Sequence, residues 1–215
     1  MTTRRPIICC ILSLLLSSCF LASAPSDRLV RVKILADGKI REQNPAWREE
    51  ISRKFEAASD FFEREFRIRL VAATIEPWDS PAPVHSTSEL LQMLKKTALL
   101  KGEDGSYDVI VGVTALPGRI MPGHARVDEI GNCREGLGKY IALSATTPLR
   151  REEPDTMLAN TDVLTLIHEF GHLFGAEHVN DRRSIMSVYF NPYSDFDPRN
   201  REIINKNKLC PFKKS

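Results

Sequence analysis

The spacing of apolar residues along the chain predicts several short strands. In residues 29–35, apolar side chains alternate with Arg31 and Lys33, which is typical of a strand with one face toward solvent. Residues 107–113 are apolar almost throughout, which is typical of a central strand buried on both faces. Similar short apolar runs predict further strands at residues 68–75, 124–130 and 140–145.

Helix signals lie between these strands. The pair Asn44-Pro45 favours a helix start, with the asparagine as the cap and the proline at the first helical position. Apolar residues at helical spacing then continue to about Phe66 and predict the face that packs on the sheet. A second helix is predicted at residues 86–100, where Ser86-Thr87-Ser88-Glu89 forms a capping box. A third is predicted to start within residues 155–161 and to end at residue 174. A fourth is predicted at residues 197–207 and begins with Asp197-Pro198.

Three of the five histidines lie in the eleven residues 168–178, which cover the end of the helix predicted to reach residue 174 and the turn after it. His168 and His172 are four residues apart, so a helix places both imidazoles on one face, with Glu169 on the adjoining face. Gly175 tolerates the left-handed conformation that ends a helix, and the resulting turn would bring His178 back as a third ligand. Three neutral imidazoles with an open fourth position for water are typical of a catalytic zinc site.

This spacing, HExxHxxGxxH, followed by Met186, resembles the metzincin zinc peptidases, and the distance to the methionine is similar to that of matrixins and archaemetzincins. Over residues 29–210 the resemblance implies an α/β (α+β) fold. It has a five-stranded mixed twisted sheet with an antiparallel edge strand, an active-site helix, a Met-turn and a C-terminal helix. Residues 124–130 fall in the place of the edge strand. Val179 and Ser184 stand where archaemetzincins carry cysteines, so the second zinc site of those proteins is expected to be absent.

The resemblance also implies a role for each residue of the motif. The three histidines would bind one catalytic Zn²⁺, and Glu169 would act as general base. Met186 would form an apolar floor below the imidazoles. Tyr189 lies one position later than the tyrosine that astacins and serralysins direct at the metal and the oxyanion. We therefore consider for Tyr189 either such a role or a place in the wall of the substrate pocket.

The N-terminus predicts a signal peptide over residues 1–18. Arg4-Arg5 forms a positive segment, and the apolar run at 7–16 has signal-peptide length but is too short for a stable transmembrane helix. The sequence Leu16-Ser17-Ser18-Cys19 resembles the lipobox of bacterial lipoproteins, in which the cysteine is lipidated.

The resemblance to lipoproteins implies a protein anchored in the bacterial cell envelope through Cys19. Because no aspartate follows Cys19, the outer membrane is favoured over the inner one. Residues 19–28 would be a tether and residues 29–215 a single domain. The alternative is cleavage after Ala24 and a secreted or periplasmic protein, although Pro25 disfavours that cut.

Export leaves Cys133 and Cys210 as an even pair in an oxidising compartment. We expect them to form a disulfide that holds the C-terminal tail against the loop before a sheet strand. The alternative is two free thiols.

Composition excludes some classes of partner. The net charge of +2 includes the two arginines of the signal peptide, and the chain has no basic run and no zinc-finger spacing, so no nucleic acid partner is expected. A chain of 215 residues suits one domain with a full core, and we expect a monomer.

The sequence therefore predicts a zinc-dependent endopeptidase that acts on extracytoplasmic proteins or peptides, with a zinc amidase for cell-wall peptides as a variant. The alternative from a different class is a zinc-binding envelope scaffold whose peptidase site is intact but unused.

Overall fold

The computed structural model describes most of the chain from Ser26 onward. The described residues are 26–80, 84–101, 106–115, 125–145, 161–189 and 194–214. The predicted signal peptide, Cys19 and His124 lie outside these ranges, as do residues 155–160, the earliest expected start of the zinc-motif helix. Within the described ranges, none of the helices combines the length and the apolar character that crossing a bilayer requires.

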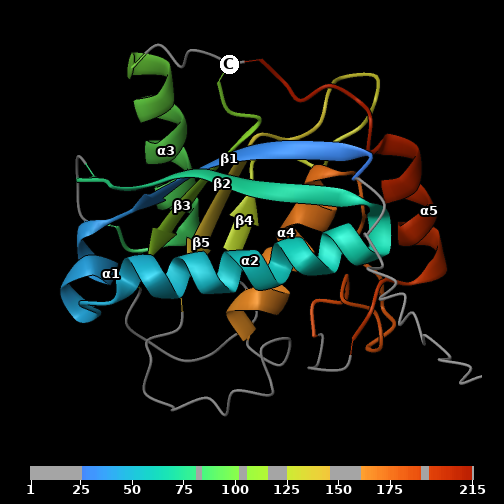
Figure 1. The fold of residues 1–215 in the computed structure, drawn as a ribbon, viewed down its shortest axis with the longest axis horizontal. Helices are drawn as coiled ribbons and strands as arrows, with labels where there is room; N and C mark the ends of the chain where they lie inside the picture. The colour runs from blue at the N-terminus through green and yellow to red at the C-terminus, as the bar shows by residue number, and fades with distance from the viewer. Residues whose placement is uncertain are drawn as a thin grey trace, which may run out of the picture.

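The centre of the molecule is a five-stranded mixed sheet with strand order β2-β1-β3-β5-β4 (Figure 1). The strands are β1 (Arg28–Ala36), β2 (Ile68–Pro77), β3 (Val109–Thr114), β4 (Ala125–Val127) and β5 (Tyr140–Ser144). Strands β2, β1, β3 and β5 run parallel to one another, whereas β4 pairs antiparallel with β5 and forms one edge of the sheet. This arrangement confirms the predicted fold class, including the antiparallel edge strand.

Helices cover the sheet on two faces. On one face, α2 (Trp47–Phe66) and α4 (Thr161–Leu173) share a continuous apolar core with the sheet strands. On the other face, α3 (Thr87–Lys101) packs in a second apolar cluster with β3 and β5. Figure 1 shows α2 running along the sheet, with α3 and α5 (Pro198–Asn207) toward opposite ends of the molecule. The zinc-motif helix α4 therefore lies inside the larger of the two cores.

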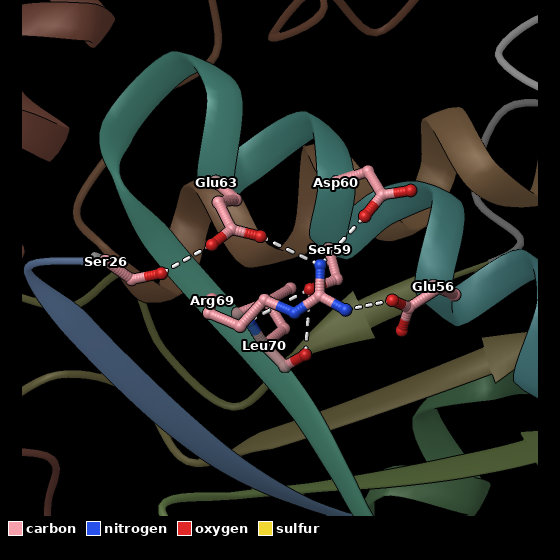
Figure 2. A network of polar contacts seen from close by, with 7 residues as sticks. All are labelled: Ser26, Glu56, Ser59, Asp60, Glu63, Arg69 and Leu70. Atoms are coloured by element: carbon pink, nitrogen blue, oxygen red, sulfur yellow. Dashed lines mark hydrogen bonds and ion pairs between the residues drawn. The ribbon is translucent and has the colours of Figure 1, made fainter. Parts of the chain in front are cut away.

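Polar contacts fasten α2 to the neighbouring strand β2 (Figure 2). The buried Ser59 hydroxyl of α2 donates to the carbonyl of Leu70 at 2.8 Å and accepts from the N–H of Leu70 at 3.1 Å. Nearby, the Arg69 guanidinium contacts three carboxylates of α2, those of Glu56, Asp60 and Glu63. Exposed ion pairs contribute little individually, so the buried hydroxyl bridge is the stronger of the two links.

Aromatic rings join the helices of the larger core. Phe62 of α2 is fully buried, and its ring centroid lies 6.0 Å from those of Phe170 and Phe174 and 6.2 Å from that of Phe196. Such offset and edge-to-face pairs add to the free energy of burying the rings. The cluster ties α2 to the zinc-motif helix and to the chain segment that leads into α5.

The predicted helix start at Asn44-Pro45 is wrong. An additional short helix, α1 (Gly38–Gln43), precedes it, capped by the Asp37 side chain, and Asn44 ends this helix in an extended conformation. A proline disfavours the helical conformation of the residue before it, here Asn44. The chain therefore turns at this point, and α2 begins at Trp47. The Asn44 side chain still accepts from the N–H of Ala46, but as part of this turn.

The edge strand is shorter than the predicted range 124–130. The strand ends at Val127. The N–H of the next residue, Asp128, still donates to the carbonyl of Tyr140 at 3.0 Å, but the Asp128 carboxylate accepts the N–H groups of Lys139 and Tyr140, both at 3.1 Å. A side chain there takes donors that a longer strand would pair with carbonyl groups.

The loop between β4 and β5 is held by the C-terminal tail. A disulfide joins Cys133 in this loop to Cys210, with their Cα atoms 5.2 Å apart. Leu137 lies beside Phe212 in a parallel bridge, and the N–H of Leu137 donates to the carbonyl of Pro211 at 2.9 Å. The tail therefore closes the fold next to the zinc-motif helix.

We predict that Phe62→Ala lowers the free energy of unfolding by about 3–5 kcal/mol, because it opens a cavity among the rings of Phe170, Phe174 and Phe196. The change is measured by urea denaturation. Leu29→Ala is the control, since the Leu29 side chain is 62% exposed, and it should change stability by less than about 1 kcal/mol. Equal stabilities for the two variants would contradict the central place of the aromatic cluster.

Candidate metal centre

The zinc-motif helix α4 is buried along nearly its whole length. Its apolar residues pack into the larger core, and its first turn is held by Asp162, whose carboxylate accepts from Lys54 of α2 at 2.6 Å. Both side chains of this pair are less than 10% exposed, and Lys54 also contacts Glu50 at 2.5 Å. Because α4 is held in this way, its polar residues His168, Glu169 and His172 have fixed positions relative to the core.

Gly175 ends this helix and reverses the chain. Its φ of +97° lies in the left-handed region, its N–H donates to the carbonyl of His172, and the N–H of Ala176 donates to the carbonyl of Gly171, both at 2.9 Å. A Cβ at Gly175 would lie 2.5 Å from the Asn207 amide nitrogen. Glycine is therefore required here both by the backbone conformation and by the close approach of α5.

The turn brings the three histidines of the motif together. The Nε2 atoms of His168, His172 and His178 form a nearly equilateral triangle with sides of 3.1, 3.1 and 3.2 Å. Three imidazoles bound to one zinc ion at 2.0–2.1 Å and tetrahedral angles would have their nitrogens about 3.3 Å apart. The donor set and its spacing therefore fit a zinc ion.

The outer ring nitrogens show which atoms face the centre of the triangle. The Nδ1 of His168 lies 2.6 Å from the carbonyl oxygen of Ile185, and the Nδ1 of His172 lies 2.7 Å from that of Ala176. A carbonyl oxygen only accepts, so each Nδ1 carries the proton and each Nε2 presents a lone pair. Contacts between two such Nε2 atoms are not hydrogen bonds, and a cation between them would relieve their repulsion.

The electrostatic environment keeps the buried ligands neutral. Burial lowers the pKa of His168 to about 3, with the neighbouring His172 as a further cause, and burial lowers the pKa of His172 to about 4. His178 is exposed and opens the cluster to solvent. Within the described part of the chain, these three residues are the only group of at least three acidic, histidine or cysteine side chains arranged to hold a metal ion.

Glu169 lies beside the cluster and is 7% exposed. Burial raises the pKa of its carboxyl to about 8, and the positive charge of Arg126 on β4 partly opposes that rise. A buried carboxyl group with a raised pKa is suited to accepting a proton and giving it up again.

Met186 lies in the tight turn that follows the third histidine. It is fully buried, and a Cβ added at Gly171 would lie 2.9 Å from the Met186 sulfur. The absence of a side chain at Gly171 thus lets the Met-turn pack directly against α4 beside His172. The adjacent carbonyl of Ile185 is the one that holds His168, so this turn both packs against α4 and orients one of the ligands. The role of Met186 as an apolar floor below the imidazoles stays a prediction.

Tyr189 extends from the same segment and is 64% exposed. Its backbone N–H donates to the Ser187 hydroxyl at 3.3 Å, and the described residues give its ring no hydrogen bond or ring contact. A role at the oxyanion or in the pocket wall therefore stays a prediction.

Sequence reasoning did not find the groups that orient the histidines. The carbonyls of Ile185 and Ala176 belong to the backbone, which carries no residue-specific signal.

Two imidazoles from α4 and one from just beyond its end converge at one point, and this site is that of a zinc metallopeptidase. A model of the family described as Metallo-peptidase family M12 matches residues 26–213, and the chain belongs to this family.

Two solved structures show the same fold at low sequence identity. Archaemetzincin from Methanopyrus kandleri is 21% identical with a TM-score of 0.52, and the match covers 83% of this chain and 95% of that chain. A chain from a solved structure described as "Structure of a chaperone-substrate complex" is 12% identical with a TM-score of 0.58, and the match covers 83% of this chain but 33% of the other. No curated protein matches the sequence.

We predict that Gly175→Ala destabilises the protein by at least about 2 kcal/mol, because alanine is strained at this φ and its Cβ would overlap α5 and the Gly131 carbonyl. Thermal or urea unfolding measures the effect. Gly38→Ala is the matched control, because the nearest atoms to its added Cβ are 3.9 Å away, and it should stay within about 1 kcal/mol of the wild type. A Gly175→Ala protein as stable as Gly38→Ala would contradict the described helix end.

Proposed function

We propose that the protein is a zinc endopeptidase that hydrolyses peptide bonds in extracytoplasmic proteins or peptides. Membership of a metallopeptidase family supports peptide bond hydrolysis. The observation that carries the proposal is the triangle of Nε2 atoms, with one side open to solvent at His178 and a buried glutamate next to it.

In this proposal His168, His172 and His178 hold the zinc ion. When bound, zinc polarises the scissile carbonyl and lowers the pKa of a water molecule toward about 7. Glu169 takes a proton from that water as it attacks the carbonyl carbon. Glu169 then passes the proton to the leaving amine, which restores the carboxylate for the next cycle.

Two features of the chain support this division of roles. The buried histidines are held neutral, which is the protonation state that binds a metal. Glu169 follows His168 directly on a buried helix, so it lies next to the ligands. It is not part of the group of three side chains that could hold the metal ion.

We predict that Glu169→Gln keeps one zinc ion per chain and lowers peptide hydrolysis by at least about 100-fold, because glutamine cannot accept the proton. Zinc content and cleavage of a mixed peptide library are measured on the same samples. Glu177→Gln is the control: its side chain is 53% exposed beside His178, and hydrolysis should stay within about twofold of the wild type.

Near-normal turnover in Glu169→Gln would show that another group is the base. A wild-type protein that binds zinc and cuts no peptide in the library would instead favour the second function, a zinc-binding envelope scaffold with an unused site.

For the setting of this activity, we infer export, with residues 1–18 as a signal peptide, lipidation at Cys19, a tether at 19–28 and a single monomeric peptidase domain at 29–215. The sequence pattern of the N-terminus supports this. Among the described residues, the N–H groups of Asp27 and Arg28 both donate to the carbonyl of Arg67, so the last two residues of the inferred tether contact the domain.

We predict that Cys19→Ser, expressed in a bacterium that processes lipoproteins, moves the protein from the membrane fraction to the soluble envelope fraction. The lipid anchor supplies most of the membrane affinity and is lost with the thiol. Fractionation and the mass of the mature N-terminus check this. A wild-type N-terminus at Pro25 without lipid would support cleavage after Ala24 and contradict the anchor.

A further inference from the structure

The first turn of α5 contacts the metal centre through a buried polar cluster. Asp197 caps this helix by accepting from the N–H of Asn200 at 3.1 Å. The Asn200 side chain is only 1% exposed, although it carries an amide that needs several hydrogen bonds. Its partners are in the segment that supplies the third histidine.

Asn200 holds the backbone of Glu177 from both sides. Its Oδ1 accepts from the N–H of Glu177 at 2.8 Å, and its Nδ2 donates to the carbonyl of Glu177 at 3.0 Å. Glu177 directly precedes His178, so these two bonds fix the peptide units that aim the third imidazole. After the helix has ended at Gly175, this segment lacks the repeating hydrogen bonds that hold the other two ligands.

A second branch of the same cluster reaches the Met-turn. One oxygen of the Asp197 carboxylate accepts from Asn200 Nδ2 at 2.8 Å and from the Ser184 hydroxyl at 2.7 Å. The Ser184 oxygen in turn accepts from the N–H of Met186 at 3.1 Å. The residue between them, Ile185, provides the carbonyl that holds His168.

The charge state of Asp197 suits this role. Burial alone raises the pKa of its carboxyl, but hydrogen bonds from Asn200 and Ser184 outweigh burial and leave the pKa below its ordinary value. An ionised carboxylate accepts stronger hydrogen bonds than a neutral group does. One anion therefore links both branches.

We propose that Asn200, Asp197 and Ser184 form a positioning cluster that holds two of the three metal ligands, His178 through the Glu177 backbone and His168 through the Ile185 carbonyl. This inference deepens the proposed function and rests on its metal site. It assigns the first turn of α5 to metal retention, in addition to capping its own helix.

A purely structural role would make Asn200 equivalent to other buried amides of α5. Asn207 provides that comparison. It is 8% exposed on the same helix, and its Nδ2 donates to the carbonyl of Phe174 at 3.0 Å, before the ligand-bearing turn. Arg199 provides another, since among the described residues its one polar contact is with the Glu177 side chain, at 2.7 Å in an exposed pair.

The test is the zinc dissociation constant of the purified full-length protein, measured by competition with a chromophoric chelator in the absence of substrate. We expect Asn200→Ala to weaken zinc binding by about 10–100-fold, the range typical when a group that orients a metal ligand is removed. Ser184→Ala removes only the second branch and should weaken zinc binding by at least about threefold. Asn207→Ala and Arg199→Ala should stay within about threefold of the wild type.

Urea unfolding of the same proteins separates positioning from stability. Zinc binding weakened by Asn200→Ala but not by Asn207→Ala at a similar loss of stability supports the proposal. Equal dissociation constants for wild type and Asn200→Ala, or equal losses for Asn200→Ala and Asn207→Ala, overturn it. If Asn200→Ala does not fold, Ser184→Ala decides, and an unchanged constant there overturns the proposal. Zinc binding without peptide cleavage in the wild type would contradict the proposed function alone.

Discussion

The convergence of three imidazole lone pairs is the constraint on which the rest of the structure depends. The Nε2 atoms of the neutral His168 and His172 lie 3.1 Å apart and repel each other, so the fold must hold these rings in place before a cation arrives. Two carbonyl groups orient His168 and His172 from outside, and a left-handed glycine turns the chain so that His178 can approach. Each of these groups can orient its imidazole only because the others hold the surrounding backbone in place.

Rigidity around the site comes from burial of the helix that carries it. At its first turn, α4 is held by the buried Asp162–Lys54 pair, and along its length by the phenylalanine cluster shared with α2. At its far end, the N–H of Gly131 in the β4–β5 loop donates to the carbonyl of His172 at 3.0 Å. That loop is joined to the C-terminal tail by the Cys133–Cys210 disulfide, so segments far apart in the sequence meet at the last turn of the active-site helix.

The third ligand has a different kind of support. His178 is exposed and lies beyond the helix, between Ala176, which is buried in the larger core, and Val179, which forms a bridge with Ser187. The polar cluster at the start of α5 lies next to this segment and holds its peptide units. The site can therefore be open to solvent at His178 while His178 is held in place, because the Asn200 side chain that holds the preceding peptide units is buried.

Sequence patterns were most informative where a residue's role follows from its spacing. The five strands, the capped start of α5 and the end of α4 at Gly175 are all found where spacing and turn residues indicate them, and the antiparallel edge is found where the family resemblance implies it. They failed where two local signals compete, as at Asn44, which ends the short helix α1 because the following proline excludes the helical conformation. They also failed at Asp128, whose side chain accepts the N–H groups of Lys139 and Tyr140.

By itself, the sequence determined that two imidazoles share a helix face and that a glycine turn follows, because each depends on chemistry within a few residues. The mixed sheet was implied by the resemblance to a known family. Only the tertiary structure decided how the rings are held. The Ile185 carbonyl, the Gly131 N–H and the Asn200 amide reach the site across separations that no local pattern encodes. Those contacts arise from packing of the whole chain, and packing depends on all the segments at once.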